Sequence, residues 1–154
     1  MHHVSDTIRA FFEDFSRANN AFAPNLLAPH MGDVLVGADP NGVVQMISKQ
    51  DYLAGIVKSQ EYLQSLGFRF VTVVPVEEIP LSEHYTVVKT KGTMRLEQTP
   101  GQPIDLAHDA AYMLFINNGK PQIVFVLSHE DPMKMVHDQH GVSYEGQPSW
   151  DQRP

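Results

Sequence analysis

An aspartate stands between two short apolar runs in the segment VLVGADPNGVVQMI, residues 34–47. The four residues at its centre are Asp39, Pro40, Asn41 and Gly42. A hairpin turn has this composition, because Asp accepts local backbone hydrogen bonds, Pro fixes φ and Gly permits a positive φ. A carboxylate at the mouth of an apolar pocket could instead act as a general base. Both interpretations stay open, and the composition favours the turn.

Two further candidates lie four residues apart in AHDAAYMLFINN, residues 107–118. Side chains alternate along a strand, so His108 and Tyr112 are expected to point the same way. If they point inward, these two residues and His84 could move a proton or hold a ligand's oxygen. The alternative is that they are hydrogen-bonded core residues or face a dimer partner. The segment is apolar on both faces beyond Ala110, so the pattern does not show which face of the strand points inward.

The other motifs are weaker candidates for a functional site. His129, in SHED at residues 128–131, could lie with Asp39 at the rim of a pocket. HDQH, residues 137–140, has two imidazoles at helical spacing, but a third ligand at a suitable distance is not evident, so no metal site is predicted. The chain has no cysteine, which excludes disulfides and thiol chemistry. No phosphate loop, serine elbow or dinucleotide fingerprint occurs, and no cofactor is expected.

The bulk composition is that of a globular protein, with 154 residues, 42% hydrophobic and 19% charged. We expect a single domain over residues 1–135 and an irregular tail over 136–154. The net charge of −7, without a lysine or arginine cluster, argues against nucleic acid and anionic membranes as partners. Neither a secretory signal nor an apolar run of about 18 residues is visible, so a cytoplasmic location is expected.

Two long helices are predicted to position these residues. The first spans residues 5–22, with Ser5 or Asp6 placed to cap it. The second spans residues 49–66, with Ser48 placed to cap it and Gly67 ending it. A short helical piece, NLLAPHM, and a hairpin around Asp39 lie between them. The apolar stripe of the first helix comprises Ile8, Phe11, Phe12, Phe15, Ala18 and Phe22, and that of the second Tyr52, Leu53, Ile56, Val57, Leu63 and Leu66.

After Gly67 the sequence predicts four antiparallel strands: FRFVTVVPVEEI, HYTVVKTKGTMRLE, AHDAAYMLFINN and QIVFVLSHE. In the second of these, polar residues concentrate at odd positions, so one face should be wet or form an interface while the other faces the helices. The order of elements predicts an α+β cone, in which a curved, mostly antiparallel sheet holds the N-terminal helices in its concave face. Three helices cannot fill such a bowl, so a cavity is expected.

This order, the phenylalanine stripe and the ending FINNGKPQIVFVLSHE resemble the nuclear transport factor 2-like superfamily, in particular its SnoaL-like and ketosteroid isomerase-like branch, over roughly residues 5–131. The superfamily includes isomerases, cyclases, dehydratases and pure binding domains. The resemblance matches Asp39 to the general base of the isomerases. It places Phe15 where they carry an oxyanion-hole tyrosine, and Tyr112 where they carry a protonated aspartate. One of the two hydrogen-bond donors of the oxyanion hole is thus lost and the other is changed, so steroid isomerisation is not expected.

Together these observations predict a pocket for a hydrophobic small molecule. The candidate catalytic residues are Asp39, His108 and Tyr112, and the candidate ligand-binding residues are Phe11, Phe15, Tyr52, Ile56, Val88, Thr90 and His129. One hypothesis is a cofactor-independent isomerase, cyclase or dehydratase that acts on a carbonyl-bearing substrate. The other is a non-catalytic ligand-binding or dimerisation module.

The polar yet β-rich face of the second strand is also expected to form an interface. Its residues are Tyr85, Val87, Lys89, Lys91 and Thr93. They are too aromatic and branched to be only solvated, and members of the resembled superfamily commonly dimerise through this side of the sheet. We expect a symmetric homodimer that buries at least about 1,000 Å².

Overall fold

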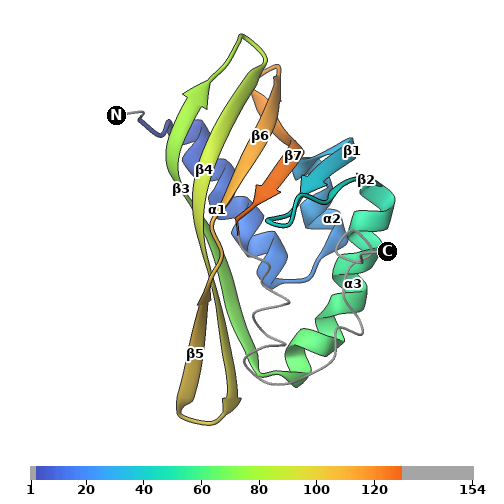
Figure 1. Ribbon diagram of the computed structural model, residues 1–154, viewed down its shortest axis with the longest axis vertical. Helices are drawn as coiled ribbons and strands as arrows, with labels where there is room; N and C mark the ends of the chain where they lie inside the picture. Colours follow the sequence, from blue (N-terminus) through green and yellow to red (C-terminus); the bar gives the residue numbers. More distant parts are fainter. Residues whose placement is uncertain (1–2, 130–154) are drawn as a thin grey trace.

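A computed structural model describes residues 3–129 of the chain. A curved sheet carries the helices on one of its faces (Figure 1). The elements are α1 Asp6–Asn20, α2 Pro24–Leu27, η1 Ala28–His30, β1 Met31–Ala38, β2 Val44–Ser48, α3 Lys49–Ser65, β3 Phe68–Pro80, β4 Tyr85–Thr99, β5 Gln102–Ala107, β6 Ala110–Asn117 and β7 Lys120–Ser128. The expected tail over 136–154, the histidine pair at 137–140 and the end of the predicted domain at 135 lie outside the described residues.

The first predicted helix is confirmed as α1, and of the two expected caps, Ser5 and Asp6, it is Ser5 that caps it. The Ser5 hydroxyl accepts a hydrogen bond from the Ile8 N–H at 3.4 Å, and Asp6 places a negative charge in the first turn. The helix ends at Asn20 rather than at 22, because Phe22 takes a left-handed conformation with φ of 49°. Its apolar stripe, with Phe12 fully buried, packs on the sheet, and the residues of this stripe from Ile8 to Ala18 belong to the larger core cluster.

The second predicted helix is confirmed as α3, capped by Ser48, whose hydroxyl accepts from the Asp51 N–H at 3.1 Å. One member of its expected stripe is wrong. Val57 is 51% exposed, whereas Ser59 is buried. A helix turns by about 100° per residue, so the face that carries Ile56 continues at the third and fourth residues beyond it and not at its neighbour.

In the described part of the chain, seven strands form one sheet in the order β2-β1-β7-β6-β4-β3, with β5 paired to β4 off this path. The pairs are antiparallel except for β1 and β7, which run parallel. The prediction of a mostly antiparallel sheet is therefore confirmed. The hairpin of β1 and β2 joins the rest of the sheet through β7.

The prediction of four strands after Gly67 is wrong, because five follow it within residues 3–129. The turn at Pro100 and Gly101, where Gly101 has φ of 81°, is tight enough for the chain to return at once along β4 as β5. The segment expected to form one strand over 107–118 is therefore the end of β5 followed by β6. Its alternation is preserved across the junction, since Thr93 pairs with Ala107 on one side and Thr90 with Ala110 on the other.

The expected faces of β4 are confirmed. The even-numbered side chains from 86 to 96 are buried beneath the helices, and the odd-numbered ones are exposed or partly exposed. On the outer face, Arg95 forms a two-pronged ion pair with Asp105 of β5 at 2.7 and 2.9 Å. Lys89 pairs with Glu77 of β3 at 3.4 Å. These two polar pairs lie on the outer face, which is the side of the sheet opposite the helices.

Candidate functional site

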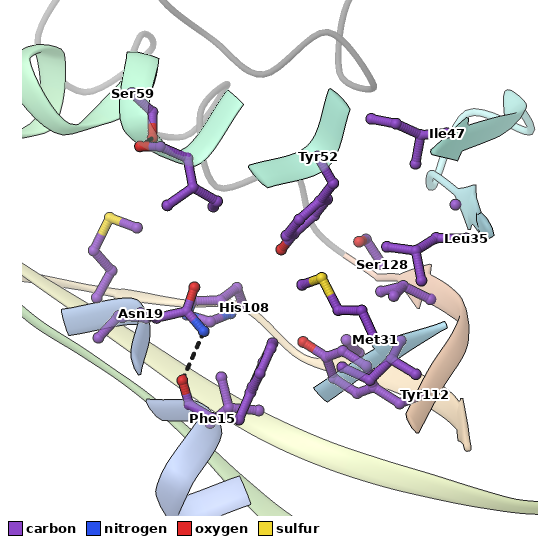
Figure 2. Close-up of a pocket in the computed structure, with 18 of the residues that line it drawn as sticks. Phe15, Asn19, Met31, Leu35, Ile47, Tyr52, Ser59, His108, Tyr112 and Ser128 are labelled. Atoms are coloured by element: carbon purple, nitrogen blue, oxygen red, sulfur yellow. Dashed lines mark hydrogen bonds between the residues drawn. The ribbon is translucent and has the colours of Figure 1, made fainter. Parts of the chain in front are cut away.

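A cavity of about 220 Å³ lies between the helices and the concave face of the sheet. Its wall is mostly apolar, and α1, α3 and the sheet all contribute to it (Figure 2). The residues on the wall that carry polar side chains are Asn19, Tyr52, Ser59, His108, Asp109, Tyr112 and Ser128. An apolar enclosure with a few polar groups is the usual composition of a small-molecule site.

Two tyrosines contribute hydroxyls from facing walls of the cavity. Tyr52 projects from α3 and Tyr112 from β6, and Figure 2 shows both hydroxyls directed into the space between helix and sheet. The Tyr112 ring is held in place by edge contacts with Phe12 and Phe15, at centroid distances of 5.3 and 5.9 Å. Burial raises the pKa of Tyr52 to about 12. It also raises the pKa of Tyr112, to which the nearby Tyr52 adds a smaller electrostatic contribution.

His108 lines the cavity from the junction between β5 and β6. Its backbone exchanges two hydrogen bonds with Gly92 of β4, at 3.0 and 3.1 Å. A Cβ at position 92 would collide with Cε1, Nδ1 and Nε2 of the His108 ring, so the imidazole lies across β4 in space that only glycine leaves open. The glycine therefore determines where this potential proton carrier sits.

Two polar residues on the helices are already engaged with backbone carbonyls. The Asn19 amide nitrogen donates to the Phe15 carbonyl at 2.8 Å, and its oxygen lies on the opposite side of the same group (Figure 2). The Ser59 hydroxyl donates to the Ile56 carbonyl at 2.9 Å. Both side chains can still accept a hydrogen bond from a ligand, because an amide oxygen and a hydroxyl oxygen each keep a lone pair.

Five of the ten predicted site residues line the cavity, namely Phe15, Tyr52, Ile56, His108 and Tyr112. The expectation that His108 and Tyr112 share the inward face agrees with their positions. His84 does not belong to the cavity lining. It is exposed just before β4, with its Nδ1 atom 3.4 Å from the Ile116 carbonyl.

Three residues predicted to contact a ligand lie in the core instead. Phe11 is buried in the core, where its ring contacts the imidazole of His30 at a centroid distance of 5.0 Å, and it does not belong to the cavity lining. Val88 is completely buried beneath the helices, and the Thr90 hydroxyl donates to the Ala110 carbonyl at 3.2 Å. Val88 and Thr90 do not belong to the cavity lining, although their cross-strand partners on β6, Tyr112 and Ala110, do.

The two predicted rim residues also lie outside the lining. His129 is exposed, and its N–H donates to the Asp109 carbonyl at 3.0 Å. Asp39 forms the turn between β1 and β2, where its Oδ1 accepts from the N–H groups of Asn41 and Val43 at 2.9 and 3.0 Å. The Asp39 carboxylate thus organises the hairpin turn and does not belong to the cavity lining, and its role as a general base stays a prediction.

The sequence did carry a signal for two residues that were missed. Asn19 follows Phe15 by four residues and Ser59 follows Ile56 by three, so each is a polar interruption of an apolar helix stripe. A polar residue on a buried face requires a partner, and a cavity is one place to find it. Asp109 and Ser128 gave no comparable signal, since their place in the lining depends on how three strands meet.

Within residues 3–129, no group of three or more histidine, aspartate or glutamate side chains is arranged to hold a metal ion. The same residues include no helix that is both long enough and apolar enough to cross a membrane.

No protein-family model matches the sequence, and no curated protein matches it significantly. Solved structures do match its fold. An NTF-2-like protein of unknown function from Shewanella oneidensis is 16% identical with a TM-score of 0.63, over 82% of this chain and 98% of that one. A ketosteroid isomerase-like protein from Erwinia carotovora is 17% identical with a TM-score of 0.57, over 79% of this chain and 92% of that one. A putative SnoaL-like polyketide cyclase from Shewanella denitrificans is 15% identical with a TM-score of 0.54, over 86% of this chain and 96% of that one.

These identities establish the shared architecture and leave the activity open, because one fold hosts many functions. The predicted resemblance is confirmed at the level of fold, including a curved sheet with helices in its concave face. The chain therefore has the nuclear transport factor 2-like α+β fold.

Proposed function

We propose that this protein binds a hydrophobic, oxygen-bearing small molecule in the cavity between α3 and the sheet. The observation that carries the proposal is the composition of the wall, in which aromatic and aliphatic side chains surround a few polar groups. Burying the apolar part of a ligand there contributes roughly 25 cal/mol for each Å² removed from water. The hydroxyls of Tyr52 and Tyr112 and the imidazole of His108 then set the orientation of the ligand.

A cavity-filling substitution tests the location. Ile56→Phe places a ring in the space that a ligand would occupy, so binding of small hydrophobic ketones, measured by equilibrium dialysis, should be lost. Val57→Phe is the matched control, because the neighbouring residue on the same helix is exposed. Loss of binding in both variants, or in neither, would place the ligand elsewhere. Tyr112→Phe and His108→Ala should each weaken binding and leave the fold intact.

A second candidate function is acid–base catalysis without a cofactor, as an isomerase, cyclase or dehydratase of a carbonyl compound. It is favoured by one observation, namely that an imidazole and two phenols line the same apolar cavity. A neutral imidazole can remove a proton next to a carbonyl, and a phenol can donate a hydrogen bond to the oxygen that becomes negative. The alternative is a module that binds without turnover.

Proton exchange separates these alternatives. If His108 is a base, a bound ketone should exchange its α-protons with deuterated solvent, and His108→Ala should stop the exchange without abolishing binding. Binding with no exchange above the rate in solvent would identify a non-catalytic module. The measurement does not require the natural substrate, since any ketone that enters the cavity can exchange its α-protons there.

We also propose that the protein forms a symmetric homodimer through the outer face of the sheet. Several apolar side chains are exposed there, among them Val34, Val44, Met46, Tyr85 and Leu127. Met46 is 77% exposed, and contiguous exposed apolar side chains mark interaction surfaces. A face of this kind is stabilised when a second copy covers it. The expected cytoplasmic location stays a prediction.

A further inference from the structure

β3 forms one end of the sheet, and its sequence favours pairing with a further strand. In the strand order of residues 3–129, β3 has a neighbouring strand, β4, on one side only. Its segment FVTVV, residues 70–74, has high β propensity and no charge. Val74 and Val76 are exposed. An edge of this kind is a template on which another strand can pair.

Two side chains of α1 are hydrogen-bonded to this edge. The Val71 N–H donates to Oδ1 of Asn20 at 2.6 Å, and Nδ2 of Asn20 donates to the Val71 carbonyl at 2.9 Å. The Ser16 hydroxyl accepts from the Val73 N–H at 2.9 Å and donates to the Val73 carbonyl at 3.4 Å. The two side chains thus satisfy the N–H and the carbonyl of both edge residues, as a neighbouring strand would.

The match between helix and strand follows from their geometry. Four residues of a helix advance by about 6 Å and two residues of a strand by about 6.6 Å, so Ser16 and Asn20 reach every second residue of β3. Alternate residues of a strand point their backbone groups to the same edge, which is why both bonded residues have odd numbers. One step further along each series come Phe12, whose side chain has no hydrogen-bonding group, and Pro75, whose backbone has no N–H. A proline at an edge also hinders pairing, so the next part of the edge is closed as well.

The backbone groups that α1 covers are complementary to the same groups of a second copy. Two β3 strands that meet antiparallel about a two-fold axis at Thr72 place Val71 of each copy opposite Val73 of the other. In that register each N–H faces a carbonyl, and hydrogen bonds between the copies replace those that the side chains make. The pattern is symmetric about Thr72, so the strand that fits it without adjustment is β3 itself.

We propose that Ser16 and Asn20 close the edge of β3, and that the strand they exclude is β3 of a second copy of the chain. The edge is thus a latent self-association surface, distinct from the outer face of the sheet. The hydrogen bonds of Asn20 are exposed to solvent, whereas those of Ser16 are partly buried. Asn20 is therefore the side chain that an approaching strand meets first.

The test removes both side chains. Ser16→Ala/Asn20→Ala leaves the edge groups without their partners and should strengthen self-association at least about 10-fold, measured by sedimentation velocity at micromolar concentrations. Cooperative urea unfolding checks that the variant is folded. Glu13→Ala/Arg17→Ala is the matched control, because these exposed residues have the same spacing on α1. Any dimer through the outer face is present in the control too, so the comparison isolates the edge.

A cysteine at the proposed axis locates the contact. The chain has no cysteine, so a disulfide in Thr72→Cys can form only between copies. Opposite residues at such a position have Cα atoms about 4.5 Å apart, which a disulfide spans. With oxidised glutathione as the oxidant, Thr72→Cys should cross-link faster when Ser16 and Asn20 are replaced by alanine. Thr93→Cys, beside it on β4 and on the same face, should not.

A charge at the same position supplies the reverse change. Thr72→Lys places like charges directly opposite each other across the axis, which opposes strand pairing. Added to Ser16→Ala/Asn20→Ala, it should return the self-association to the level of the control variant.

The outcomes are distinct. Stronger association that Thr72→Lys cancels, with faster cross-linking at position 72 alone, supports the closed edge. Association no stronger than in the control, or cross-linking that rises equally at positions 72 and 93, overturns it. If the double variant does not fold, Asn20→Ala replaces it, because this side chain is exposed. Asn20→Ala should then associate more strongly than Arg17→Ala, and equal association of the two overturns the proposal.

Discussion

The imidazole of His108 lies across the α-carbon of Gly92, one strand away, and the backbones of the two residues exchange a pair of hydrogen bonds at 3.0 and 3.1 Å. Any larger residue at position 92 would occupy the space of the ring. Gly92→Ala should therefore destabilise the protein by about 1–3 kcal/mol through overpacking, measured by denaturant unfolding.

A double substitution tests the cause of that loss. If the methyl group clashes with the ring, Gly92→Ala combined with His108→Ala should be less destabilised than the sum of the two single variants. Additive losses would show that Gly92 matters for a reason other than the imidazole. Weaker ketone binding in Gly92→Ala would further indicate that the displaced ring intrudes on the cavity.

The stability of the protein should fall in alkaline solution because of Tyr52. Its pKa is about 12 in the folded state against 10 for an unperturbed tyrosine, so between pH 10 and 12 the unfolded chain releases a proton that the folded chain keeps. Stability is complete below pH 10 and declines as the pH rises, by at most about 1.4 kcal/mol per pH unit for this group.

Urea unfolding between pH 8 and pH 12 measures this decline. Tyr52→Phe should flatten the curve at its alkaline end, and Tyr112→Phe should do the same, since burial also raises the pKa of that phenol. A curve for Tyr52→Phe that falls as steeply as the wild-type curve would contradict the burial of this hydroxyl.

Substitutions of Asp39 distinguish a turn from a general base. Asp39→Ala removes the acceptor of two backbone hydrogen bonds, from Asn41 and Val43, and should destabilise the protein by about 1 kcal/mol, seen as a lower Tm. Asp39→Asn keeps an oxygen acceptor and should retain most of the stability and all of the ketone binding. If Asp39→Asn abolished proton exchange of a bound ketone, the carboxylate would be a base after all.

The proposed dimer is tested by a charge at the centre of the outer face. Val87 lies beside Met113 of β6, and the neighbouring pair of Tyr85 and Phe115 has a centroid distance of 5.4 Å. Val87→Glu should convert a dimer into a monomer in sedimentation velocity at micromolar concentration, because an unpaired charge would be buried. Leu26→Glu, at an exposed position on α2, should leave the dimer intact. A wild-type protein that is already a monomer would refute the interface.

The elements that sequence predicted well are those with strong local determinants. Both long helices could be located because Ser5 and Ser48 cap them and their apolar residues recur at intervals of three and four residues. The faces of β4 could be predicted because side chains alternate along any strand. β5 was missed because Gln102 and Pro103 lack β propensity, and the strand exists only through its pairing with β4.

The site was predicted in part for the same reason. Tyr112 and His108 could be found because alternation placed them on one face, and Phe15, Tyr52 and Ile56 because helix stripes must face the sheet. Thr90 and Val88 satisfy the same rule and still lie outside the cavity. The pattern gives the direction of a side chain, but the depth of a cavity at each point depends on how several elements pack together.

The parallel pairing of β1 with β7 has a consequence for how the chain reaches its folded state. Met31 pairs with Ile123, so the contact closes a loop of about 90 residues. The hairpin that carries Leu35 and Ile47 joins the sheet through this contact, and both residues belong to the cavity wall. During synthesis, this side of the wall cannot join the sheet until β7 has emerged. Long-range closure of this kind slows folding, so the cavity should be among the last parts of the molecule to form.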